Sequence, residues 1–154
     1  MDTVFRNRKA AFVWGFMAIW LAMLIAFTSL FLRDGVPAGQ SPLLFVGVLA
    51  VFWIGGVGAA SYAASLPLIE VRVAAIGVVR VRRRYLWRVE ERNYGRQAPL
   101  RATLVEGRDS DNDPYFRARL ELPEGDTIDL WEGHDRDHAQ AEVERFQRSA
   151  GAVG

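Results

Sequence analysis

The sequence has no cysteine, a single lysine and only two histidines among its 154 residues. Without cysteine, the chain cannot form disulfides, thiolate zinc sites, iron–sulfur clusters or thiol nucleophiles. Lys9 follows no glycine-rich loop, which excludes a Walker-type phosphate loop and argues against a buried Schiff-base lysine. No G-x-S-x-G elbow is present. We therefore expect a protein that is not an enzyme, with no catalytic residues and no cofactor.

Charge is also missing from two long stretches, since residues 10–32 and 35–69 contain no Asp, Glu, Lys, Arg or His. A helix rises 1.5 Å per residue, so about 20 apolar residues cross a hydrocarbon layer about 30 Å thick. The sequence predicts two transmembrane helices, at about 10–32 and 43–65, with Pro42 in the first turn of the second helix. A turn rich in glycine and proline, residues 33–41, joins them.

The alternative for the first stretch is a cleaved signal peptide, because Val36-Pro37-Ala38 imitates a small-residue cleavage site. The apolar run is longer than a typical signal-peptide core, and a second span follows it. We therefore expect a retained membrane anchor in residues 1–69 and a separate domain in residues 70–154.

The basic residues beside the spans predict the orientation. Arg6, Arg8 and Lys9 precede the first span, whereas the connecting loop offers only Arg33. The arginines that follow the second span are Arg72, Arg80, Arg82, Arg83 and Arg84. By the positive-inside rule, we expect both termini on the cytoplasmic side of a multi-pass protein of the cytoplasmic (inner) membrane.

The second span is rich in small residues spaced by four. Small residues at this spacing let helix backbones approach closely, which is how helices associate in lipid. The residues of this expected helix-packing interface are Gly47, Gly55, Gly56, Ala59, Ala60 and Ala63. They either pack only on the chain's own first helix or dock on another membrane protein or a second copy of the chain.

Beyond the spans, apolar and polar residues alternate with period two. Between Val78 and Glu90, apolar side chains occupy most odd positions, through Tyr85, Trp87 and Val89, and arginines most even ones. This pattern predicts one or two strands with one buried face. Similar alternation recurs in residues 100–104, 115–122 and 128–130. Residues 135–149 instead have the period of an amphipathic helix. We expect a small α+β domain, with a curved antiparallel sheet or partly open barrel of about six strands and one C-terminal helix.

The run from Val78 to Glu91, the hairpin through residues 123–126 and the final helix together resemble the bacterial PH-like domain proteins. In that family a two-helix membrane hairpin precedes a small curved antiparallel sheet and a C-terminal helix. The resemblance implies a PH-like fold for residues 70–154 and a binding or assembly role in preference to catalysis.

The charges of the domain are unevenly distributed, since Arg72 to Arg101 holds nine arginines against only Glu90 and Glu91. This basic segment directly follows the second span, so we expect it to face anionic lipid headgroups. The arginines expected to face lipid are Arg72, Arg80, Arg82, Arg83, Arg84 and Arg88. Alternatively, they only fix topology and solvate a strand. The acidic remainder of the domain would repel phosphates, so we expect no nucleic-acid partner.

His134 and His138 are the weak candidates for a metal site, because histidines four apart on a helix can bind one ion. The competing interpretation is helix-start chemistry, in which acids such as Asp135 cap free amides. Asp109, Asp111 and Asp113 imitate the opening of a calcium loop, but Pro114 and Leu120 occupy positions that need glycine and glutamate. A solvated hairpin loop is the better interpretation.

These observations favour a membrane accessory, scaffold or assembly protein, which docks on an integral membrane protein complex or on itself through its small-residue face and PH-like domain. Two alternatives remain: a membrane-anchored, metal-dependent hydrolase that uses His134 and His138, and a module that binds anionic lipid headgroups.

Overall fold

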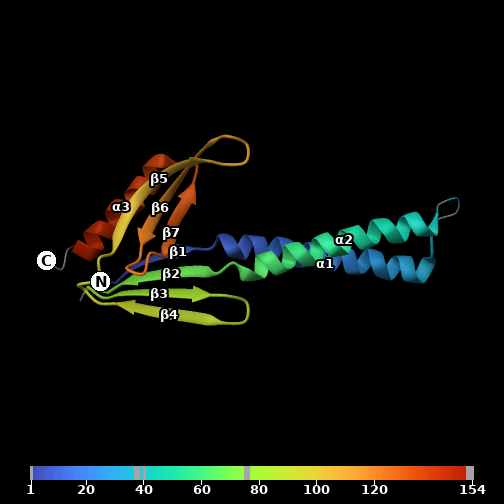
Figure 1. Cartoon of the computed structure of the whole chain (residues 1–154), viewed down its shortest axis with the longest axis horizontal. Helices are drawn as coiled ribbons and strands as arrows, with labels where there is room; N and C mark the ends of the chain where they lie inside the picture. The colour runs from blue at the N-terminus through green and yellow to red at the C-terminus, as the bar shows by residue number, and fades with distance from the viewer. Residues whose placement is uncertain (1, 37–38, 40, 75–76, 152–154) are drawn as a thin grey trace. The chain divides into compact units, whose positions relative to one another are not determined.

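The computed structural model describes residues 2–36, 39, 41–74 and 77–151. The chain divides into two compact units. One, here called the domain, combines Met1–Arg8 with Leu68–Gly154; the other, here called the helical hairpin, is Lys9–Pro67. Figure 1 shows the elements of both units.

The hairpin consists of α1 (Lys9–Asp34) and α2 (Pro42–Ser65), both long and apolar enough to cross a membrane. Pro42 lies in the first turn of α2, as its sequence position predicts. Two indole N–H groups tie the helices together, because Trp14 donates to the carbonyl oxygen of Ala63 at 2.8 Å and Trp53 donates to Thr28 Oγ1 at 2.9 Å. Both predicted helices are confirmed. Pro37, Ala38 and Gln40 of the predicted connecting turn lie outside the described residues.

The domain contains two antiparallel sheets followed by a helix. The first sheet has the order β1-β2-β3-β4, made of Thr3–Asn7, Leu68–Val73, Val79–Arg84 and Val89–Tyr94. The second has the order β5-β6-β7, made of Arg101–Arg108, Pro114–Glu121 and Thr127–Gly133. Helix α3, Arg136–Gly151, closes the chain. The α+β class and the C-terminal helix are confirmed.

The expected single sheet or partly open barrel is replaced by these two sheets, and the described residues form no closed barrel. The hydrogen bonding between consecutive strands is interrupted at the segment that connects β4 to β5. There the amide of Ala98 donates to Gly95 and that of Leu100 donates to Ala98, so the backbone turns on itself. Pro99, between them, has no N–H to offer a neighbouring strand.

Strand β1 belongs to the domain, although the sequence predicts that residues 1–69 form the anchor. Thr3–Asn7 instead pairs with β2, with Asn7 opposite Ile69 and Thr3 opposite Val73. The side chain of Phe5 is buried in the domain core. A five-residue strand whose partner lies beyond two long helices leaves little local signal. The helical hairpin therefore occupies the place of the turn in a β1–β2 antiparallel pair.

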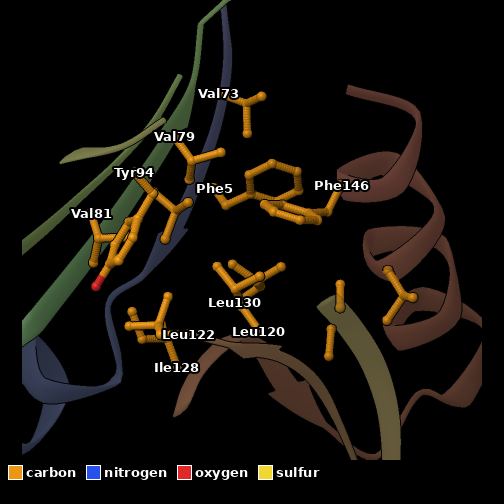
Figure 2. Packing of buried hydrophobic residues seen from close by; sticks show 14 residues of the cluster. Phe5, Val73, Val79, Val81, Tyr94, Leu120, Leu122, Ile128, Leu130 and Phe146 are labelled. Carbon is orange, nitrogen blue, oxygen red and sulfur yellow. The ribbon is translucent and has the colours of Figure 1, made fainter. Parts of the chain in front are cut away.

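The core of the domain lies between the two sheets and α3 (Figure 2). Val71, Val79 and Val81 contribute from the first sheet and Leu120, Ile128 and Leu130 from the second. Phe146 reaches this core from α3. Because these residues come from both sheets and from α3, one cluster joins all three layers. Burial of side chains of this size stabilises the fold by about 1.5–3 kcal/mol each.

The predicted buried face from Val79 to Val89 holds only for its first part. Val79 and Val81 are buried, but the strand ends at Arg84, and Trp87 and Val89 are exposed. The register pairs Val79 with Tyr94 and Arg84 with Val89, so odd positions of β3 share a face with even positions of β4. The parity of the inward residues therefore switches across the turn.

Candidate functional site

The small residues of α2 form two series that point in different directions. Gly56 and Ala63 are buried against α1, and a Cβ atom added at Gly56 would lie 3.0 Å from Leu24 Cδ1. Ala60 is half-buried on the same side. Gly55 and Ala59 are exposed, and a Cβ at Gly55 would meet no atom within 4 Å. In the described part of the hairpin, the packing of α2 on α1 thus covers Gly56, Ala60 and Ala63 and leaves Gly55 and Ala59 open.

Gly55 and Ala59, together with the buried Gly56, line a groove on the surface of the hairpin, with a volume of about 270 Å³. Its walls include Val51 and Phe52 from α2 and Phe16 and Trp20 from α1. We call it the Gly55 groove. Gly47 is exposed, with open space at its Cβ position, and does not line the groove. The predicted interface therefore divides into an inner seam, an outer groove and a separate exposed glycine.

The outer face of the β1–β4 sheet carries alternating charges. Glu70 accepts hydrogen bonds from Arg6 and Arg72, and Arg80 pairs with Glu91 at 3.2 Å. The Arg72 guanidinium, with a smaller contribution from Arg6, holds the pKa of Glu70 below its ordinary value. This face carries charges of both signs, and three of its arginines, Arg6, Arg72 and Arg80, are already paired.

The six arginines expected to face lipid do not share one surface. Arg83 lies on the inner side of β3 and donates to Asp126 in the β6–β7 turn at 2.6 Å, which lowers the pKa of that carboxyl group. Arg88 lies in the β3–β4 turn and pairs with Glu90 at 3.2 Å. Arg82 and Arg84 have no ion-pair partner within the described ranges. Both lie on the outer face, where Arg82 is opposite Glu70 on one side and Glu91 on the other in the strand register.

The two histidines have separate partners. His134 Nδ1 lies 2.9 Å from the carbonyl oxygen of Pro114, and its Nε2 lies 3.5 Å from Asp109. The ring of His138 packs against that of Trp131, with centroids 4.8 Å apart and planes tilted by 30°. The part of the chain that the structure describes contains no group of three or more metal-ligating side chains.

Local capping explains the acidic residues near both histidines. The backbone N–H of His138 donates to Asp135 Oδ1 at 2.9 Å, so Asp135 caps α3, which begins at Arg136. Asp109 Oδ1 accepts from the amides of Asp111 and Asp113, at 2.9 and 3.0 Å. The helix-start and hairpin-loop interpretations therefore account for these side chains.

Comparison of the chain with protein-family models, with curated proteins and with solved structures finds no match. The resemblance to the bacterial PH-like domain proteins stays a prediction.

Proposed function

We propose that this chain is a non-catalytic accessory protein of the cytoplasmic membrane, which docks on a transmembrane helix of a partner protein through the Gly55 groove. The observation that carries the proposal is the division of small residues on α2. Gly56 and Ala63 are used within the hairpin, whereas Gly55 and Ala59 are left open beside it.

The exposed side chains of the hairpin favour lipid, and not water, as its surroundings. Large apolar side chains are exposed along both helices, including Phe12 at 78% and Leu43 at 83%. In water, so extensive an apolar surface would be an aggregation site. In lipid it is solvated, and the backbone hydrogen bonds of both helices are satisfied internally. We therefore treat α1 and α2 as transmembrane spans.

Strand pairing in the domain supports a hairpin whose two ends lie on the same side of the membrane. Strand β1 ends at Asn7, just before α1, and β2 begins at Leu68, just after α2. Because these strands are neighbours in one sheet, both ends of the hairpin adjoin the same folded domain. Two spans satisfy this requirement, and the basic flanks favour the cytoplasm for that side.

The shape of the groove favours a convex helix of another protein. The small residues Gly55, Gly56 and Ala59 line it together with the aromatic side chains of Phe16, Trp20 and Phe52. Two identical grooves placed face to face would leave a void, which forfeits the packing contacts that drive helix association in lipid. A helix ridge from a partner protein would fill the groove. Antiparallel sheets with a C-terminal helix, the elements that the PH-like resemblance implies, would then present a cytoplasmic surface to the same complex.

Co-purification of the full chain in mild detergent tests the docking. We expect Gly55→Leu and Ala59→Leu each to abolish recovery of the partner, identified by mass spectrometry, because the new side chains fill the groove. Ala50→Leu is the matched control, since Ala50 is exposed and does not line the groove. Unchanged recovery in both groove variants would refute the docking, and recovery of only a second copy would replace the partner by self-association.

A further inference from the structure

The turn between β3 and β4 concentrates exposed apolar side chains. Leu86, Trp87 and Val89 are 58%, 68% and 51% exposed, and no other large hydrophobic side chain in the described part of the domain is exposed. The guanidinium of Arg88 lies over the ring of Tyr85, 4.4 Å from its centroid. We call residues 85–89 the aromatic turn. A domain that buries its other large apolar side chains exposes three together at this one place.

The backbone conformation of the turn does not require apolar residues at positions 86 and 87. The amide of Tyr85 donates to the carbonyl of Arg88 at 2.8 Å, so Leu86 and Trp87 occupy the tip. Neither has a positive φ, and polar residues would serve such a turn equally well in water. The apolar tip therefore needs an explanation outside the folding of the hairpin.

The position of the turn supplies that explanation. In the strand register, Arg84 lies opposite Leu68, the first residue of β2, and the turn continues beyond Arg84 (Figure 1). Leu68 follows Ser65, the last residue of α2, by three residues, which span at most about 11 Å. Strand β1 also ends at this edge of the sheet, because Asn7 pairs with Ile69. Chain connectivity alone thus keeps the aromatic turn near both points where the chain leaves the proposed spans.

We propose that the aromatic turn inserts Leu86 and Trp87 into the headgroup layer of the bilayer that α1 and α2 cross. This inference rests on the membrane anchoring proposed above. Tryptophan and tyrosine favour the membrane–water interface, where the ring is half in lipid and its polar group stays wet. Arg82 and Arg84, which have no ion-pair partner in the described ranges, lie on the outer sheet face close to the turn. Each arginine near an anionic surface contributes about 1 kcal/mol.

Insertion would fix the domain against the membrane at a second place, in addition to its covalent links to the hairpin. The outer sheet face, with its charges of both signs, would then be held beside the headgroups. A membrane surface suits the turn better than a protein pocket, because the flanking arginines match anionic phosphates and the apolar set is small. Contact with a protein remains a distinct outcome of the test.

Spin labelling tests the insertion, because a chain without cysteine accepts a unique label at any introduced cysteine. The full chain carrying Leu86→Cys is labelled with a nitroxide and reconstituted in vesicles of phosphatidylcholine and phosphatidylglycerol. Gln97→Cys is the matched control, since Gln97 is exposed and follows Tyr94, at the opposite end of the β3–β4 ladder. Power saturation then compares the accessibility of each label to oxygen, which enriches in lipid, and to a water-soluble nickel complex.

We expect the label at position 86 to be more accessible to oxygen than to nickel, and the label at position 97 to show the reverse. Preferential access of nickel at both positions would overturn the insertion. A label at position 86 shielded from both reagents would overturn it as well, because it would indicate contact with protein.

Alkaline carbonate extraction of the same vesicles separates this inference from the anchoring. A chain that resists carbonate but exposes position 86 to nickel refutes the inserted turn and leaves the anchoring intact. A chain released by carbonate refutes both. In vesicles of phosphatidylcholine alone we expect shallower immersion of position 86, and an unchanged depth would refute the contribution of Arg82 and Arg84.

Discussion

The ring of Phe5, which precedes the first long helix, packs against the ring of Phe146 in the last helix, with centroids 5.8 Å apart and planes tilted by 57°. Both side chains are almost fully buried. The two ends of the chain therefore meet in one core, although both apolar helices lie between them in the sequence.

Replacement of Phe5 by alanine should destabilise the domain by about 3–5 kcal/mol, because it removes a buried aromatic side chain and leaves a cavity beside Phe146. Proteolysis of the full chain in detergent, followed as a function of urea, measures this loss. Phe12→Ala is the control, since the Phe12 side chain lies exposed on the hairpin. Equal urea midpoints for the two variants would contradict the role of Phe5.

The domain should fold without the hairpin only if strand β1 is retained. We expect residues 68–154 alone to lack fixed tertiary packing, since β2 loses its neighbour and the site of Phe5 is empty. Residues 2–8 joined to residues 68–154 through Asn-Gly should fold, because the Asn7–Ile69 pairing leaves the ends ready for a two-residue turn. Dispersion of amide NMR signals distinguishes the two polypeptides, and a well-dispersed spectrum from residues 68–154 alone would refute this expectation.

Gly56→Val should loosen the hairpin, because a Cβ at this position would already lie 3.0 Å from Leu24 Cδ1 and 3.3 Å from Trp20 Nε1. Gly47→Val makes the same substitution where the Cβ would meet nothing within 4 Å. Thermal unfolding in detergent, followed by tryptophan fluorescence, should show a lower midpoint for Gly56→Val only. Equal midpoints would indicate that the helices do not pack through Gly56.

Acid should weaken the domain through Glu70 and Asp126. Both carboxyl groups have a lowered pKa, Glu70 chiefly through hydrogen bonding from Arg72 and Asp126 chiefly through hydrogen bonding from Arg83. The folded state therefore binds fewer protons than the unfolded state just below the ordinary carboxyl pKa of about 4. Their stabilisation is complete above that pH and is lost as the pH falls through the lower, folded pKa values. Urea unfolding of the full chain between pH 7 and pH 3 should show this loss, and the slope should shrink in Asp126→Asn.

The two long helices could be predicted from sequence because each depends on one local property, an uncharged apolar run of sufficient length. Strand β1 could not, because its pairing with β2 is non-local and its five residues carry only weak alternation. The exposure of Leu86 and Trp87 could not be predicted from the sequence for a different reason. Period-two alternation continues through Tyr85 and Trp87, whereas the chain turns there and the inward parity changes.

The candidate site was predicted in part. Spacing alone identified the small residues of α2, but Gly55 and Gly56 are neighbours that point about 100° apart on a helix. Only the positions of Trp20 and Leu24 on α1 show which of the two is covered. Likewise, the sequence does not separate Arg83 from the outer arginines, because its partner Asp126 lies far along the chain.

The pairing of β1 with β2 also bears on biogenesis. Thr3–Asn7 is synthesised before both apolar helices, whereas its partner strand follows them. If only one of the two helices were inserted, β1 and β2 would lie on opposite sides of the membrane. The edge of β2 would then be unpaired and the site of Phe5 in the core would be empty. In the proposed anchor, completion of this sheet therefore requires both helices to cross the membrane, so that β1 and β2 reach the same side.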